Sequence, residues 1–140
     1  MKRKHLSWEQ VGLDISVLVS KLVGQEFGAI LGVARGGLVP AAVIANALNI
    51  RVVDTAPVTS YRAPGRRERL QLLLPLRPLP EPVLVVDDLV DSGTTVRFLR
   101  SLLPASTKVA VVYVKPIGQS ATDFFAIPVP QSTWLCFPWE

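Results

Sequence analysis

Cysteine is almost absent from this chain, and its absence excludes two kinds of structural support. Cys136 is the only cysteine in 140 residues, so the chain can form neither an internal disulfide nor a zinc site built from several thiolates. A chain of this length buries about two-thirds of the surface that it exposes when unfolded, which is enough for a core without cross-links. We expect one domain over residues 1–140, in the reducing environment of the cytoplasm.

Long apolar segments are missing as well. The two longest stretches without a charged residue are 36–50 and 124–139, and both contain prolines. A membrane-spanning helix needs about 20 consecutive apolar residues, so neither stretch can cross a bilayer. The first five residues are basic, but they lead into Trp8 and Glu9 and not into the apolar core of a secretory signal. We therefore expect no membrane partner.

Positive charge is concentrated in two short segments. The net charge is +4 at pH 7; residues 2–4 contribute three positive charges and residues 62–69 contribute three more, so the rest of the chain carries a net charge of −2. A nucleic-acid-binding protein usually spreads its basic residues along one face. Local basic segments suit the phosphates of a small ligand, and we expect no nucleic-acid partner.

Apolar runs alternate with helical patterns along the chain. Strands are expected at residues 27–33, 51–55, 70–74, 82–86 and 108–114, and helices from Trp8 to a stop at Gly24, at 38–48 and at 94–103. This alternation predicts an α/β fold with a mainly parallel central sheet flanked by helices. Such sheets bind ligands at the carboxyl ends of their strands, where the turns at Arg35 and Asp87 are expected.

Residues 83–95 carry the strongest chemical signal. Four apolar residues lead to Asp87 and Asp88, which are followed by Asp91 and by a Ser-Gly-Thr-Thr turn that opens a helix. Backbone N–H groups and hydroxyls at a helix start bind a phosphate monoester. Neighbouring carboxylates suit sugar hydroxyls and a hydrated magnesium ion. Helix capping alone requires neither three aspartates nor two adjacent threonines, so the segment predicts a site for a phosphorylated sugar.

Residues 87–95 closely resemble the signature with which type I phosphoribosyltransferases bind 5-phosphoribosyl 1-diphosphate (PRPP). Further segments resemble the bacterial xanthine-guanine members of that family, in the same order and at similar spacing: 32–40, 53–55, 115–118, 131–134 and 138–139. The resemblance covers nearly the whole chain. It implies the fold of that family, with a flexible loop at about residues 60–70 and a small C-terminal purine-binding hood at about residues 115–140.

The resemblance also implies an activity. The family transfers the 5-phosphoribosyl group from PRPP to a purine base with the help of Mg²⁺, and its xanthine-guanine members use the 6-oxopurines guanine, xanthine and hypoxanthine. The expected products are GMP, XMP or IMP together with diphosphate, in purine salvage. The expected assembly is a homodimer or homotetramer.

Carried over residue by residue, the resemblance implies roles for the sugar-phosphate side of the site. Asp87 and Asp88 would hold the ribose hydroxyls and magnesium. Asp91 would lie near the purine N7 and either act as general base or stabilise the proton there. The 5-phosphate would be bound by Asp91, Ser92, Gly93, Thr94 and Thr95. Arg35 and Gly36 would bind the diphosphate.

The remaining implied roles concern the base and the loop. Lys115 would donate to the 6-oxo oxygen, Trp134 would stack on the purine, and the backbone of Leu135 would meet the 2-position of the base. The flexible loop would close over the diphosphate with Ser60, Tyr61, Arg66, Arg67 and Arg69.

Two alternatives stay open. The chain could be a regulator on the same fold that senses PRPP or nucleotides and contacts nucleic acid, or a phosphoribosyltransferase for another base. Ala34 stands where the bacterial family has a serine and Cys136 where it often has an acidic residue, which leaves the preferred 6-oxopurine open. His5 is expected to lie in a frayed terminus without a role. For Trp139, a place in the core or at a dimer interface is as well supported as a role in the site.

Overall fold

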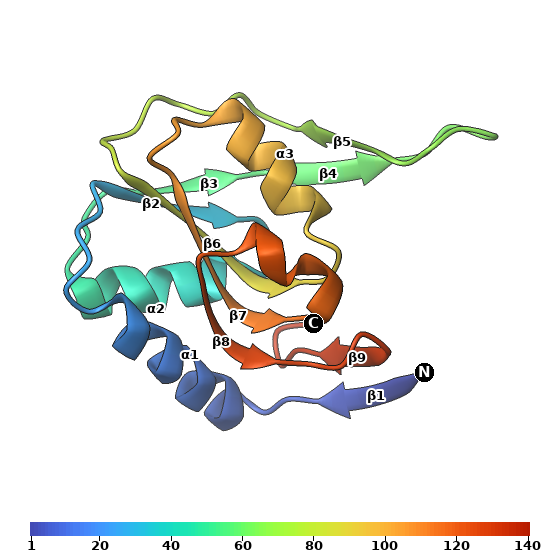
Figure 1. The fold of residues 1–140 in the computed structure, drawn as a ribbon, viewed down its shortest axis with the longest axis horizontal. Helices are drawn as coiled ribbons and strands as arrows, with labels where there is room; N and C mark the ends of the chain where they lie inside the picture. The colour runs from blue at the N-terminus through green and yellow to red at the C-terminus, as the bar shows by residue number, and fades with distance from the viewer.

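A five-stranded parallel sheet forms the centre of the computed structural model, which describes residues 1–140 (Figure 1). The strands lie in the order β3-β2-β6-β7-β8 and every pairing between them is parallel. Their bounds are Ala29–Val33 for β2, Val53–Ala56 for β3, Val83–Val90 for β6, Lys108–Val114 for β7 and Phe124–Pro128 for β8. The prediction of a mainly parallel sheet is confirmed.

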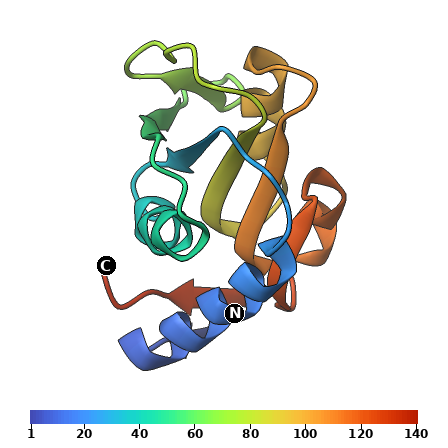
Figure 2. The ribbon, with the colours of Figure 1, turned by 90° about the vertical axis from the view of Figure 1, so that its left-hand side faces the viewer.

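Helices cover both faces of this sheet (Figure 2). Helices α1 (Trp8–Leu22) and α2 (Leu38–Leu48) pack on one face, and α3 (Thr94–Leu102) packs on the other beside the short 3₁₀ helix η1 (Pro116–Ala121). The side chain of Ser7 caps α1 by accepting a hydrogen bond from the Gln10 N–H at 3.0 Å. None of the helices is both long and apolar enough to span a bilayer.

Strand β6 shows how the sheet separates two cores. Leu84 and Val86 belong to the core under α1 and α2, whereas Val83 and Val85 belong to the core under α3. Because successive side chains point to opposite faces, burial on both faces fixes the strand firmly. The strand runs four residues beyond its predicted end at Val86, because Asp87, Leu89 and Val90 still pair with β7.

The prediction of a frayed N-terminus is wrong. Residues Lys2–His5 form β1, which pairs in parallel with β9 (Thr133–Cys136) and places His5 opposite Cys136. Leu6 follows β1 into the core, and its N–H donates to the Cys136 carbonyl oxygen at 2.9 Å. The two strands form a small sheet beside the main one, and this sheet adds β1 to the hood expected at about residues 115–140.

A hairpin projects beyond the carboxyl edge of the main sheet (Figure 1). It consists of β4 (Val58–Tyr61) and β5 (Arg69–Leu72), paired antiparallel. The connector that follows is tied to β3 by Arg77, whose guanidinium lies 3.0 Å from the Asp54 carboxylate. Hydrogen bonds from Arg77 and from the Thr55 N–H hold the pKa of Asp54 below its usual value.

Candidate active site

Three adjoining pockets line the carboxyl edge of the sheet. The first, of about 290 Å³, lies between the turn after β2, the hairpin and the end of β6. The second, of about 140 Å³, is formed by the segment from Asp87 to Val96. The third, of about 680 Å³, is lined by Arg35, Gly36, Asp88, Trp139 and Glu140. The first pocket shares Asp87 and Thr95 with the second and Arg35, Gly36 and Asp88 with the third, so the second and third pockets both adjoin the first.

The turn between β2 and α2 fits against β6 only because it carries two glycines. A Cβ atom on Gly36 would overlap the carboxylate of Asp88, and one on Gly37 would lie 2.5 Å from the Val33 carbonyl oxygen. The absence of both side chains allows this close approach of backbone to strand. Arg35 precedes them, is exposed and makes no side-chain hydrogen bond within the protein. Its guanidinium is therefore available to an anion in the first or third pocket.

Asp87 and Asp88 place two carboxylates side by side in a poorly solvated position. The Asp87 residue is only 9% exposed, and burial, with repulsion from Asp88, raises its pKa well above the usual value. Burial also raises the pKa of Asp88. The N–H of Asp88 donates to Asp87 Oδ1 at 2.8 Å, and the N–H of Leu89 donates to Asp88 Oδ1 at 2.7 Å. Such a pair is poised for a ligand that supplies donors or positive charge.

This donor set fits magnesium bound jointly by protein and substrate. Mg²⁺ usually takes one or two protein carboxylates, and water and phosphate oxygens fill its other positions. The protein has no group of three or more His, Cys, Asp or Glu side chains arranged to hold a metal ion. A closed metal cage is therefore excluded, whereas the two hard carboxylate donors beside an open pocket suit an ion completed by a phosphorylated ligand.

The turn at residues 92–95 has the geometry of an anion-binding loop. Gly93 has a φ of 89°, in the left-handed region that glycine adopts without strain. Ser92 Oγ and Thr94 Oγ1 lie 2.8 Å apart, and α3 begins at Thr94. Arg97 steadies the turn by donating to the Ser92 carbonyl oxygen at 2.8 Å. The hydroxyls and the free N–H groups of the helix start can thus bind a phosphate in the second pocket.

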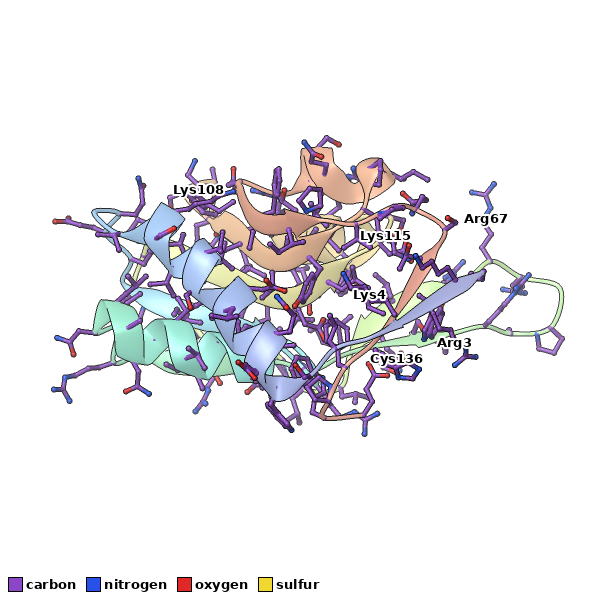
Figure 3. All side chains as sticks on the ribbon, turned by 90° about the horizontal axis from the view of Figure 1, so that it is seen from below. Arg3, Lys4, Arg67, Lys108, Lys115 and Cys136 are labelled. Atoms are coloured by element: carbon purple, nitrogen blue, oxygen red, sulfur yellow. The ribbon has the colours of Figure 1, made fainter.

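The structure brings Asp91 and Lys115 together. Lys115 follows β7, its side chain is only 5% exposed, and its Nζ lies 3.3 Å from Asp91 Oδ2. Asp91, at the end of β6, is 58% exposed and can meet a ligand in the second pocket. Figure 3 shows Lys115 at the end of the molecule from which the hairpin projects. A buried ammonium with one protein acceptor keeps two N–H donors free for a ligand.

Gln131 is a neighbour of this pair that sequence reasoning missed. Its Nε2 donates to Asp91 Oδ1 at 2.6 Å, and its Oε1 accepts from the Ile117 N–H at 3.0 Å. The two contacts span 40 and 14 residues of sequence, so no local pattern reports them. Glu140 was missed for the same reason: only the fold makes it line the third pocket together with Arg35 and Asp88.

Neighbouring residues of the hood differ in their exposure. The Trp134 side chain is half exposed, whereas the Leu135 side chain is buried in the core, which leaves only the Leu135 backbone for a ligand. Trp139 is partly buried, and its ring stacks on Phe137 at a centroid distance of 4.8 Å. Trp139 is therefore a packing aromatic, and it also lines the third pocket.

Only one of the predicted loop residues lines a pocket of the site. Ser60 lines the first pocket, whereas Tyr61, Arg66, Arg67 and Arg69 line none of the three pockets. Figure 3 places Arg67 on the hairpin and Arg3 on β1 at the same end of the molecule. The role of these arginines in ligand binding stays a prediction.

Known proteins are similar to this chain in sequence and in fold. The family model for the phosphoribosyl transferase domain matches residues 6–140. The xanthine-guanine phosphoribosyltransferase of Idiomarina loihiensis is 42% identical over 138 residues, which cover 96% of this chain and 85% of that protein. The corresponding protein of Cereibacter sphaeroides is 39% identical over 144 residues, 97% and 86% of the two chains.

A solved structure agrees with these relatives. The purine phosphoribosyltransferase of Pyrococcus horikoshii has a TM-score of 0.86 and 29% identity to this chain, over 100% of this chain and 95% of that one. The acid pair, the anion-binding turn and the matched residues 6–140 all indicate the same family. The chain belongs to the phosphoribosyltransferase family.

Proposed function

We propose that this protein transfers the 5-phosphoribosyl group from PRPP to a 6-oxopurine, giving the nucleoside 5′-monophosphate and diphosphate in purine salvage. The observation that carries the proposal is the buried Lys115 ammonium beside Asp91, a residue that lines the second pocket. Relatives that share about 40% of the sequence over nearly the whole chain are named xanthine-guanine phosphoribosyltransferases, which supports the same activity.

The donor would lie along the three pockets. Ser92, Gly93, Thr94 and Thr95 would bind the 5-phosphate through N–H groups and hydroxyls at the start of α3, where the helix dipole favours an anion. Asp87 and Asp88 would accept hydrogen bonds from the ribose hydroxyls. On the far side of the ribose, Arg35 and the Gly36 backbone would bind the diphosphate. This order follows the shared lining residues of the pockets.

Asp87 and Asp88 would also hold magnesium. When bound, the ion neutralises charge on the departing diphosphate. The two carboxylates must be ionised to hold it, and burial opposes this in the free protein by raising the pKa of both residues. Donor and metal binding would thus be coupled to proton release from the acid pair.

The displacement takes place at the anomeric carbon. Positive charge builds on the sugar ring as the bond to diphosphate lengthens, as it does in glycoside hydrolysis. The protein would contribute charge stabilisation of the leaving group through Arg35 and alignment of the base opposite that group. Ser60 and the hairpin arginines would close over the diphosphate and exclude water.

The base would be recognised by three groups. Lys115 Nζ would donate to the 6-oxo oxygen, which adenine lacks. Trp134 would stack on the ring, a contact worth about 1–3 kcal/mol that does not select among purines. The Leu135 backbone would meet the 2-position. Asp91 would then accept the proton of the purine N7 as the new bond forms.

The protein would act as one catalytic domain with a mobile loop at about residues 60–70 and a purine-binding hood at about residues 115–140. It would work in the cytoplasm as a homodimer or homotetramer. GMP, XMP or IMP would be its nucleotide product.

Product formation tests this function. Purified protein is incubated with PRPP, Mg²⁺ and guanine, xanthine, hypoxanthine or uracil, and nucleotides are separated by chromatography. We expect a monophosphate from at least one 6-oxopurine, none from uracil, and none after chelation of magnesium. Binding of PRPP without formation of any nucleotide would contradict the proposal and favour a regulator on the same fold.

A further inference from the structure

Gln131 connects three parts of the site. It lies between β8 and β9, its carboxamide contacts Asp91 at the end of β6, and it contacts Ile117 at the start of η1. The contact with Asp91 is 2.6 Å long, shorter than the 3.3 Å contact between Lys115 and the same carboxylate. Gln131 is therefore the closest polar partner of Asp91.

The orientation of the Gln131 amide follows from its partners. A backbone N–H can only donate, so the oxygen end of the amide must face Ile117 and the nitrogen end must face Asp91. The contact with Ile117 thus fixes a donor in front of Asp91. Rotation of the amide by half a turn would place two donors against each other at Ile117 and two acceptors against each other at Asp91.

This arrangement makes the two oxygens of Asp91 unequal. Oδ1 receives the Gln131 N–H, whereas Oδ2 receives the Lys115 ammonium. Under the proposed function, Lys115 turns toward the 6-oxo oxygen when a purine binds. Only Oδ2 is then released, while Oδ1 stays bound to Gln131.

We propose that Gln131 is a positioning residue that fixes the Asp91 carboxylate and directs Oδ2, and not Oδ1, toward the purine. This inference rests on the proposed function. It extends that function by assigning the proton transfer to one oxygen atom and its alignment to a glutamine on the hood side of the site. Misplacement of a reacting group by about 1 Å costs on the order of 10²-fold in rate.

A simpler role for Gln131 would be to tether the hood segment to η1 through Ile117. Gln131→Glu separates the two roles, because a glutamate oxygen still accepts the Ile117 N–H but offers no N–H to Asp91. Gln131→Ala removes both contacts. Gln119→Glu is the matched control: Gln119 is exposed on η1 and makes no side-chain hydrogen bond, so the same chemical change is made near the site without touching Asp91.

Steady-state kinetics with PRPP, Mg²⁺ and guanine give the readout, with thermal unfolding as a check on folding. We expect kcat to fall about 10- to 100-fold in both Gln131→Glu and Gln131→Ala. The KM for PRPP should stay within about threefold of wild type, because the donor-binding residues are unchanged. Gln119→Glu should match wild type in kcat, in both KM values and in unfolding temperature.

Other results would overturn the inference. A Gln131→Glu enzyme with wild-type kcat, beside a Gln131→Ala enzyme whose defect is a raised KM for guanine, would show that the tether is the whole role. Equal loss of PRPP binding and turnover would likewise reject positioning in favour of general disruption. A wild-type protein that forms no nucleotide would instead reject the proposed function, and this inference with it.

Discussion

At the scale of single residues, Asp87 is the clearest case of a side chain whose proposed role in binding would come at the expense of stability. Its carboxyl is buried beside Asp88 and its pKa lies well above that of a carboxyl in an unfolded chain. Between these two pKa values the unfolded chain binds fewer protons than the folded one. The free protein therefore loses stability as the pH rises from the ordinary carboxyl range near 4 toward the raised pKa.

Asp87→Asn tests this trade-off. The amide removes the ionisable group while it keeps the shape of the side chain, so we expect the free variant to gain about 1 kcal/mol in free energy of unfolding at neutral pH. The gain should shrink as the pH is lowered toward 4. PRPP binding should be lost. Urea unfolding at several pH values measures the first effect, and a variant that is less stable than wild type at neutral pH would contradict the account.

Lys115→Met tests recognition of the 6-oxo oxygen. Methionine keeps the apolar stem but removes the ammonium, and a hydrogen bond to a charged donor is worth about 1.5–3 kcal/mol. We expect kcat/KM for guanine to fall about 10- to 100-fold, with little change in PRPP binding. The control is Lys108→Met, at the exposed start of β7, the strand that Lys115 follows (Figure 3). An unchanged ratio of guanine to adenine activity in Lys115→Met would remove Lys115 from base selection.

At the scale of elements, the turn after β2 has to fit against the end of β6. Gly36→Ala would drive a Cβ into the Asp88 carboxylate, so we expect a loss of about 1–3 kcal/mol in stability and about 10²-fold in kcat/KM for PRPP. Gly12→Ala is the control, because a Cβ there meets no atom within 4 Å.

The control substitution should change stability in the opposite direction. Gly12 lies inside α1, where alanine is favoured over glycine by about 0.5–1 kcal/mol, so Gly12→Ala should raise the unfolding temperature and leave kinetics unchanged. Calorimetry and PRPP kinetics on both variants check the pair. A Gly36→Ala protein as active as wild type would show that the turn does not need the close approach.

Elements with local signals were predictable from the sequence. The predicted bounds 38–48 and 108–114 coincide with α2 and β7. Helix α2 has Pro40 in its first turn and a left-handed Asn49 at its end, so both of its ends have local sequence signals. Strand β1 was missed, because its only strand partner is β9, at the other end of the chain.

The candidate site likewise contains residues that the sequence predicted and residues that only the fold brings together. Residues 87–95 are contiguous, so their order alone predicted that an acid pair and a phosphate-sized turn would adjoin. Gln131 and Glu140 reach the site across long sequence distances, and no spacing rule reports such contacts. The pairing of Lys115 with Asp91 also required the structure, since it depends on the parallel register of β6 and β7.

At the scale of the whole molecule, the hairpin and the hood lie on either side of the carboxyl edge of the sheet (Figure 1). The basic segments of the chain are on these two elements, in strand β1 and in the hairpin turn. The positive charge of the protein is therefore gathered around the mouth of the site, which favours the approach of a highly charged donor such as PRPP.

The proposed function is the transfer of phosphoribose to purines that carry a 6-oxo group. Its most direct test is the initial rate of diphosphate release from PRPP and Mg²⁺ by the purified protein, measured with guanine and with adenine at equal concentrations. We expect release with guanine and little or none with adenine. Equal release with both bases, or release with adenine alone, would contradict it.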